Sequence, residues 1–258
     1  MTFNPDAPYQ FSQVPDLDAL IGLELVKGAT TLTQTGFNAD VDTSPEDIWP
    51  IGGDYVFPND SGEAMEIVSS DPADTTQTYR VIGLDSEGEW KIEFIETLNG
   101  LTAVPLANNF SRINLINNCS STPTVGDITV RPAGGGDTYA IAPAINQQSN
   151  QLIFSVPKNT KARLNALTGT MEKSIGSDAS VALGVQIRVD GGPFRTVFGF
   201  GAQRSGSSSP FFHIPAPQTF GGIGFITDIK MRAEASDPNI RISGFFNVTM
   251  FDNVKPGT

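Results

Sequence analysis

The sequence predicts an all-β protein, and three observations support this prediction. Short apolar runs alternate with turn clusters at intervals of about 8–12 residues, a spacing typical of β-sandwiches and barrels. The 258 residues include 26 Gly and 18 Pro, which supply turns between short strands. Helical periodicity is scarce along the chain. We therefore expect two β-sandwich or jelly-roll-like domains with an N-terminal arm.

Composition divides the chain into three parts. Residues 1–40 contain Pro5, Pro8 and Pro15 and only one short apolar stretch, so they are expected to form an arm. A β-sandwich docking domain is expected at residues 41–132 and a C-terminal β-sandwich domain at residues 137–258. The three glycines at 134–136 lie between the two domains. A run of glycine has no side chains to pack and is typical of a flexible boundary.

Strands are expected wherever an apolar run ends in turn residues. The predicted strands are 64–68, 78–84, 89–97, 101–106, 110–117, 127–131, 152–156, 161–167, 181–189, 194–200, 223–233 and 240–251. The clearest alternation falls within 89–97, where Trp90, Ile92 and Phe94 are expected to face a core. Lys91 and Glu93 alternate with them and are expected to face water.

The charge of the chain argues against nucleic acid as a partner. The formal net charge is −12, and clustered Lys and Arg are what polyphosphates require. This charge is uneven, because residues 1–135 carry 20 acids against 5 bases whereas residues 136–258 carry 8 against 11. No stretch of 18 apolar residues and no signal peptide occur, so no membrane contact is expected.

Histidine and cysteine are too few to suggest a catalytic or zinc site. His213 is the single histidine and lies between apolar residues in a proline-bracketed segment, and no G-x-S-x-G elbow accompanies it. Cys119 is the single cysteine, with no neighbouring basic residue to lower its pKa. One His and one Cys make a zinc site improbable, and no phosphate-binding glycine loop is present. No catalytic, cofactor-binding or metal residue is therefore assigned.

Acidic pairs are the remaining candidates for chemistry. They are Asp40 with Asp42, Glu46 with Asp47, and Asp71 with Asp74. Two carboxylates can hydrolyse a glycosidic bond if they lie about 5–10 Å apart, and acidic loops can bind calcium. Spacing along the chain does not establish that separation, and no pair matches an ordered calcium loop. We expect solvated turn residues at all three places.

Aromatic residues are concentrated in the C-terminal half. They include Phe194, Phe198, Phe200, Phe211, Phe212, Phe220, Phe225, Phe245, Phe246 and Phe251. Core packing is the expectation for most of these rings. Some are expected to be buried between subunits instead, because strand edges in a chain rich in turns need covering.

One ordered series of motifs resembles a known family. It begins with Asp47-Ile-Trp-Pro-Ile-Gly-Gly-Asp54 and continues with Arg80-Val-Ile-Gly-Leu-Asp85, Thr97-Leu-Asn-Gly100 and Gly126-Asp-Ile-Thr-Val130. This series is similar to a family of virion structural proteins of tailed bacteriophages, described as fibre-like or capsid-associated. The resemblance covers about residues 40–132. Before the Arg80 strand the chain has a shorter loop, Thr75 to Thr78, than the family's usual one.

The resemblance implies a role in particle architecture and no catalytic residues. We expect a non-enzymatic component of the head or tail, of the decoration, fibre or adaptor type, assembled in the host cytoplasm and located in the virion. Its expected partners are other virion proteins and further copies of itself, as a homo-oligomer and most plausibly a trimer. The first alternative is a receptor module that binds a host glycan. The second, less favoured alternative is a polysaccharide depolymerase.

Overall fold

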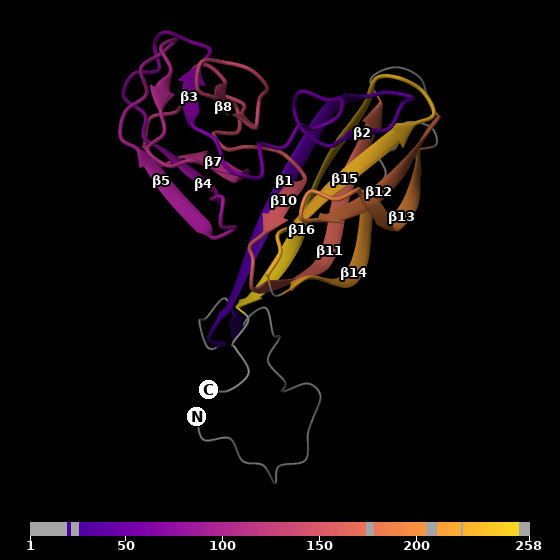
Figure 1. Ribbon diagram of the computed structural model, residues 1–258. Helices are drawn as coiled ribbons and strands as arrows, with labels where there is room; N and C mark the ends of the chain where they lie inside the picture. The colour runs from indigo at the N-terminus through magenta and orange to yellow at the C-terminus, as the bar shows by residue number, and fades with distance from the viewer. Residues whose placement is uncertain (1–19, 22–25, 174–177, 205–210, 223, 253–258) are drawn as a thin grey trace, which may run out of the picture.

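The computed structural model describes residues 20–21, 26–173, 178–204, 211–222 and 224–252. These residues form strands in several antiparallel sheets, so the predicted all-β class is confirmed. Figure 1 shows two lobes, one carrying β3, β4, β5, β7 and β8 and the other carrying β1, β2 and β10 to β16. We call the second lobe the sandwich, and we call residues 50–149 the insert lobe.

The sandwich consists of two packed sheets. The first has the order β1-β16-β11-β14, with β1 at Ala29–Val41, β16 at Ile240–Asp252, β11 at Thr160–Lys173 and β14 at Phe211–Gly222. The second has the order β10-β15-β12-β13, with β10 at Ile153–Val156, β15 at Thr227–Ala235, β12 at Ala179–Val189 and β13 at Arg195–Arg204; β2 at Glu46–Asp47 pairs with β15. Side chains from both sheets, such as Leu167 and Ile229, form one buried core between them.

The insert lobe has two smaller sheets around a core of its own. The first has the order β6-β3-β8-β9, with β6 at Val104–Pro105, β3 at Met65–Ser69, β8 at Ile128–Pro132 and β9 at Ala140–Ala142. The second has the order β5-β4-β7, with β5 at Trp90–Ile95, β4 at Tyr79–Leu84 and β7 at Arg112–Asn118. Tyr79, Phe110 and Ile116 lie fully buried in this second core.

The expected division of the chain into arm and domains needs two corrections. The arm predicted at residues 1–40 ends earlier, because β1 begins at Ala29 and pairs with β16 from Ala29↔Phe251 to Val41↔Ile240. Residues 1–19 and 22–25 of that predicted arm lie outside the described residues. Sandwich strands therefore come from both sides of the insert lobe in sequence, and β1 completes a sheet whose other strands lie about 120 residues or more further along the chain.

The second correction concerns the boundary predicted at the three glycines. They form the turn between β8 and β9, which pair in one sheet through Val130↔Ala140. Positive φ angles, from 88° at Gly134 to 133° at Gly136, explain why glycine is needed in this turn. The carboxylate of Glu66 accepts hydrogen bonds from the Gly134 N–H at 3.0 Å and from Arg131 Nε at 2.8 Å. These two donors, the backbone N–H foremost, lower the pKa of Glu66.

Strand β5 lies where it was expected and Trp90 packs against the sandwich core, but the positions after it face the opposite way to the prediction. Ile92 and Phe94, which were expected in the core, are 57% and 54% exposed, while Glu93 is buried. The Glu93 carboxylate accepts hydrogen bonds from the backbone N–H groups of Ala107 and Asn108 at 2.5 and 3.0 Å. Because these bonds satisfy the buried charge, Glu93 takes the inward position and its apolar neighbours face water.

The two lobes are joined by direct contacts between strands. The side-chain amide of Asn114, on β7, accepts from the Ser155 N–H at 2.8 Å and donates to the Ser155 carbonyl at 2.9 Å. It thereby pairs with the edge of β10 as a neighbouring strand would. Trp90 of the insert lobe packs against Phe154 of the sandwich, with ring centroids 6.1 Å apart. The insert lobe is therefore held in a defined position against the sandwich.

Candidate interaction surfaces

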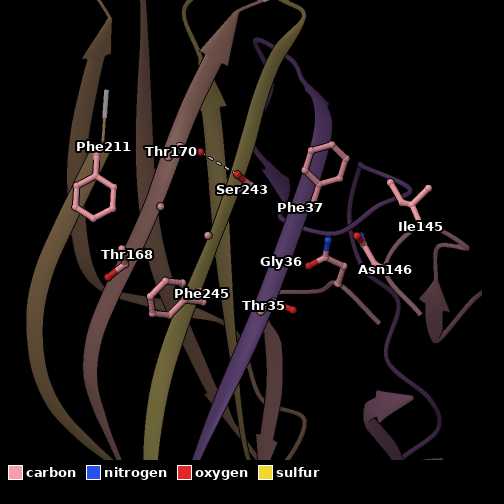
Figure 2. A pocket seen from close by; sticks show the side chains of 13 residues that line it. Thr35, Gly36, Phe37, Ile145, Asn146, Thr168, Thr170, Phe211, Ser243 and Phe245 are labelled. Carbon is pink, nitrogen blue, oxygen red and sulfur yellow. Dashed lines mark hydrogen bonds between the residues drawn. The ribbon is translucent and has the colours of Figure 1, made fainter. Parts of the chain in front are cut away.

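A hollow of about 470 Å³ lies on the outer face of the first sandwich sheet. Its sides come from β1, β16, β11 and β14, and a loop of the insert lobe that carries Ile145 and Asn146 closes one side. Figure 2 shows Phe37 and Ile145 on one side of this hollow, with Phe211 and Phe245 across it. We call it the sheet hollow.

Two rows of side chains cross the sheet at the hollow. One row runs through Phe211, Thr170, Ser243 and Phe37, as the strand register places these residues opposite one another. Its ends are therefore aromatic, and its middle is a hydroxyl pair in which Thr170 Oγ1 and Ser243 Oγ lie 2.9 Å apart, drawn as a dashed line in Figure 2. The parallel row runs through His213, Thr168, Phe245 and Thr35.

A line of three glycines lies between these rows. Gly36 pairs with Gly244 and Gly244 pairs with Gly169, so three neighbouring strands have no side chain at this position of the sheet. On the inner side the packing is close, because a Cβ at Gly36 would lie 2.6 Å from the Leu152 nitrogen and well within contact of its side chain. The core therefore demands glycine here, because the missing side chains would point inward, between the two sheets.

The exposed rings of the hollow were among the aromatic residues singled out in the sequence. Phe211 is 67% exposed and Phe245 is 37% exposed, whereas Phe212, Phe220 and Phe246 are buried in the core. Core packing is therefore confirmed for Phe212, Phe220 and Phe246, and burial of the exposed rings between subunits stays a prediction. What the sequence did not reveal is β14 itself, since its prolines suggested a loop. Proline is tolerated there because β14 is an edge strand.

A second apolar surface covers the outer face of the β5-β4-β7 sheet. Ile92 and Phe94 stand on β5, and the cross-strand partner of Ile92 is Ile82 on β4. β5 is at the edge of this sheet. The insert lobe around it carries 13 Asp and Glu against 4 Lys and Arg, a net charge of −9. An apolar strip within an acidic lobe is the result, and we call it the β5 face.

Strand β13 leaves a long open edge on the sandwich. Its ten residues pair with β12 on one side, and in the described part of the chain β13 is the last strand of its sheet. An open edge exposes backbone N–H and C=O groups that can pair with another strand. Partly buried Phe198 and Phe200 pack from this strand against the sandwich core.

A buried ionic cluster fixes the junction of the lobes. Arg112 and Asp228 are each 1% exposed, with Arg112 Nε 2.8 Å from Asp228 Oδ1 and Nη2 2.6 Å from Asp60. Arg188 and the Ser155 hydroxyl also reach Asp228, at 2.7 and 2.5 Å. Burial alone would lower the pKa of Arg112, but the two aspartates outweigh it and raise that pKa. The charges are thus compensated within the protein.

A polar hollow of about 500 Å³ lies beside this cluster. Arg188 lies over the ring of Phe57 at 4.1 Å, and Lys230 lies over Phe194 at 4.4 Å. Both cations are already engaged, Arg188 by Asp228 and Lys230 by the buried Asp47 at 2.9 Å. These pairs explain why the hollow has cations without an excess of positive charge.

The acidic pairs found in the sequence are not all solvated turn residues. Asp47 and Asp74 are fully buried and Glu46 is 7% exposed, which corrects that expectation, while Asp40 and Asp42 are exposed. Burial raises the pKa of Asp47, although Lys230 and its other partners oppose this. The structure therefore uses several carboxylates as internal acceptors.

Asp74 shows how such an acceptor works. Its carboxylate accepts from Ser69 Oγ at 2.5 Å and from the N–H groups of Val125 and Gly126 at 2.8 and 3.0 Å. Donors from the end of β3 and from the loop before β8 thereby converge on one buried charge, as an ionised buried carboxylate requires. Asp74 holds these segments together, whereas its sequence partner Asp71 stays partly exposed.

Neither His213 nor Cys119 belongs to such a cluster of buried charged groups. His213 is an exposed residue of β14, and its Nδ1 lies 2.8 Å from Thr168 Oγ1. Cys119 is an exposed free thiol at the end of β7. Within the described ranges no group of three or more His, Cys, Asp and Glu side chains could hold a metal ion. In the same part of the chain no helix has the length and apolarity to cross a membrane.

Comparisons with known proteins give distant likenesses. No family model matches the chain, and no curated protein matches it. Among solved structures, infectious bursal disease virus of the Gt strain is similar with 13% identity and a TM-score of 0.27, over 94% of this chain and 80% of that one. The VP2 subviral particle of the same virus shows 14% identity and a TM-score of 0.23, over 94% and 75%. TM-scores this low do not establish a shared fold.

Proposed function

We propose that this protein is a non-catalytic virion structural component of a tailed bacteriophage, an oligomeric accessory of the head or tail that acts by docking and self-association. The ordered motif series between Asp47 and Val130 supports the phage assignment. The single observation that carries the mode of action is the outward direction of Ile92 and Phe94 on β5. The protein resides in the virion, after assembly in the host cytoplasm.

The β5 face is the docking surface for another virion protein. Exposing two large apolar side chains on an edge strand costs free energy in an isolated subunit, and contiguous apolar patches of this kind mark interaction sites. The net charge of −9 on the insert lobe favours a partner with a basic rim around an apolar centre. The insert lobe also carries nearly all of the motif series, as expected for the part that fits a shared particle.

The sandwich supplies self-association through the open edge of β13. Pairing of this ten-residue strand with a neighbouring copy would satisfy its free backbone groups. A ring of three copies, each contributing one edge and one complementary surface, is the stoichiometry we propose.

The docking surface is tested with the full chain and particles that lack this protein. The double variant Ile92→Asn with Phe94→Asn should bind such particles about tenfold or more weakly, because two apolar anchors are lost. The matched control is Leu101→Asn with Val125→Asn, whose residues are 60% and 64% exposed elsewhere in the insert lobe. Equal binding of both double variants and the unchanged chain would show that the β5 face does not dock.

Self-association is tested by sedimentation at micromolar concentration. The unchanged chain should sediment as an oligomer, and Thr196→Lys with Gln203→Lys should shift it to monomer by placing charge along the β13 edge. Both positions are exposed, so the fold should persist in circular dichroism. A single 27.5 kDa species for the unchanged chain would contradict the oligomer.

A further inference from the structure

We infer that the sheet hollow binds a neutral saccharide. The inference concerns a surface that neither the β5 face nor the β13 edge includes, so it stands apart from the docking role. It rests on two properties of the hollow: exposed aromatic rings and uncharged hydrogen-bonding side chains between them.

Aromatic rings supply the apolar contact that a sugar ring needs. Phe211 and Phe245 stand on neighbouring outer rows of the sheet, with Phe37 at the far end of the Phe211 row (Figure 2). Each presents a flat apolar surface to solvent, and the C–H faces of pyranose rings are apolar as well. An isolated subunit gains nothing from exposing Phe211 to 67%. A sugar ring stacked on these side chains would cover them.

Hydroxyl and amide groups lie between the rings. Thr170 and Ser243 form a hydroxyl pair at 2.9 Å in the centre of one row, and Asn146 reaches the hollow from the insert lobe. Hydroxyls and amides both donate and accept hydrogen bonds. Sugar hydroxyls do the same, so they can exchange bonds with this lining in either direction. A few polar groups among apolar walls is the usual composition of a small-ligand site.

The lining also selects the charge of the ligand. Among the described residues that line the hollow, none is Asp, Glu, Lys, Arg or His, although the chain has 28 acids and 16 bases. The nearby guanidinium of Arg241 lies 5.8 Å from the Phe37 ring centroid and is 3.5 Å from the Glu172 carboxylate. Because the described lining is uncharged and the net charge of −12 repels an acidic sugar, a neutral saccharide fits best.

The size of the hollow favours a small ligand over a second copy of the chain. Its volume of about 470 Å³ lies within the range of about 300–1,000 Å³ for small-molecule sites. A stable interface between copies needs about 800 Å² from each partner and an apolar centre. Here the hydroxyl pair occupies the middle of the row instead. The hollow also lies where two lobes meet, a frequent position for ligand sites.

The test uses the full chain and a panel of neutral hexasaccharides: maltohexaose, cellohexaose, mannohexaose and chitohexaose. Hexagalacturonate serves as the acidic counterpart. Calorimetry or ligand-observed NMR should detect at least one neutral member binding in the millimolar range or tighter. Phe211→Ala and Phe245→Ala should each weaken that binding about tenfold or more. The matched control is Leu101→Ala, since this side chain is 60% exposed on the other lobe and its loss should leave binding unchanged.

Sedimentation of the same variants separates this inference from the docking role. Phe211→Ala and Phe245→Ala should leave the oligomer intact, and thermal unfolding should confirm that both fold. The inference is overturned if no neutral member binds, if hexagalacturonate binds equally well, or if both variants bind like the unchanged chain. Loss of the oligomer in these variants would overturn it too, since the hollow would then be an interface between copies.

Discussion

Replacement of Arg112 by methionine tests whether the ionic cluster locks the two lobes together. The guanidinium is 1% exposed, donates to Asp228 at 2.8 and 3.0 Å and to Asp60 at 2.6 Å, and also donates to the Ser111 carbonyl at 2.6 Å. Methionine fills much of the space but offers no donor. The variant therefore leaves the buried Asp228 with only Arg188 and the Ser155 hydroxyl.

The expected cost follows from the loss of one partner of a buried ion pair. Such losses destabilise proteins by about 3–5 kcal/mol. We expect the lower end, about 3 kcal/mol, because Arg188 still faces Asp228 at 2.7 Å. For a chain of this size that corresponds to a fall in Tm of about 6–12 °C.

Urea unfolding followed by tryptophan fluorescence measures this change. Trp90 packs against Phe154 across the lobe junction, so its emission should report separation of the lobes. The matched control is Arg131→Met, whose partner Glu66 lies in the same lobe and whose side chain is 35% exposed. That control should cost less than about 1 kcal/mol. Equal unfolding midpoints for the two variants would refute the reasoning, because the buried cluster would then contribute no more than a surface pair.

Three further predictions concern packing, pH and the lone histidine. Gly36→Ala should lower Tm by several degrees through its clash with Leu152, whereas Gly199→Ala, whose nearest neighbour would lie at 3.6 Å, should be tolerated; thermal melts compare them. Burial raises the pKa of Tyr79 to about 12, so the unfolded chain loses its phenolic proton first and stability should fall as pH rises from about 10 to 12. Tyr79→Phe should flatten that alkaline loss, and an unchanged slope would contradict the assignment. His213→Ala should leave folding, particle assembly and infectivity unchanged, since His213 is exposed and its described side-chain hydrogen bond is with Thr168; loss of activity by a variant that still folds and assembles would argue for catalysis.

Most strands were predictable, and the failures have local causes. β12 follows an apolar run that ends in Asp190-Gly191-Gly192, and both sides of that turn form strands as expected. β14 was missed because its prolines signal loops, although an edge position permits them. β1 was missed because its Thr-rich alternation gains stability only from β16, about 210 residues away in sequence. Pairing over such distances leaves no local signature.

The sites were less predictable than the strands. The sequence showed that Phe residues are concentrated in the C-terminal half but not which of them lie outside the core. Phe211 faces solvent and the adjacent Phe212 faces the core, so which ring is exposed depends on the direction of a strand that was not expected. The sheet hollow needs residues from four strands and one loop of the other lobe, which no spacing along the chain brings together. Asp74 was predicted to be a solvated turn residue, since two of its donors, the N–H groups of Val125 and Gly126, lie about 50 residues further along the chain.

The sequence by itself determined the all-β class, the acidic character of the first half and the position of most turns, because these depend on residue type and on neighbours a few places away. Only the tertiary structure decided that β1 belongs to the sandwich, that residues 50–149 form an inserted lobe and that Glu93 points inward while Ile92 and Phe94 point outward. The physical reason is the same in each case. Alternating apolar and polar residues indicate that the two faces of a strand differ, but hydrogen bonds and packing from distant segments decide which face is buried.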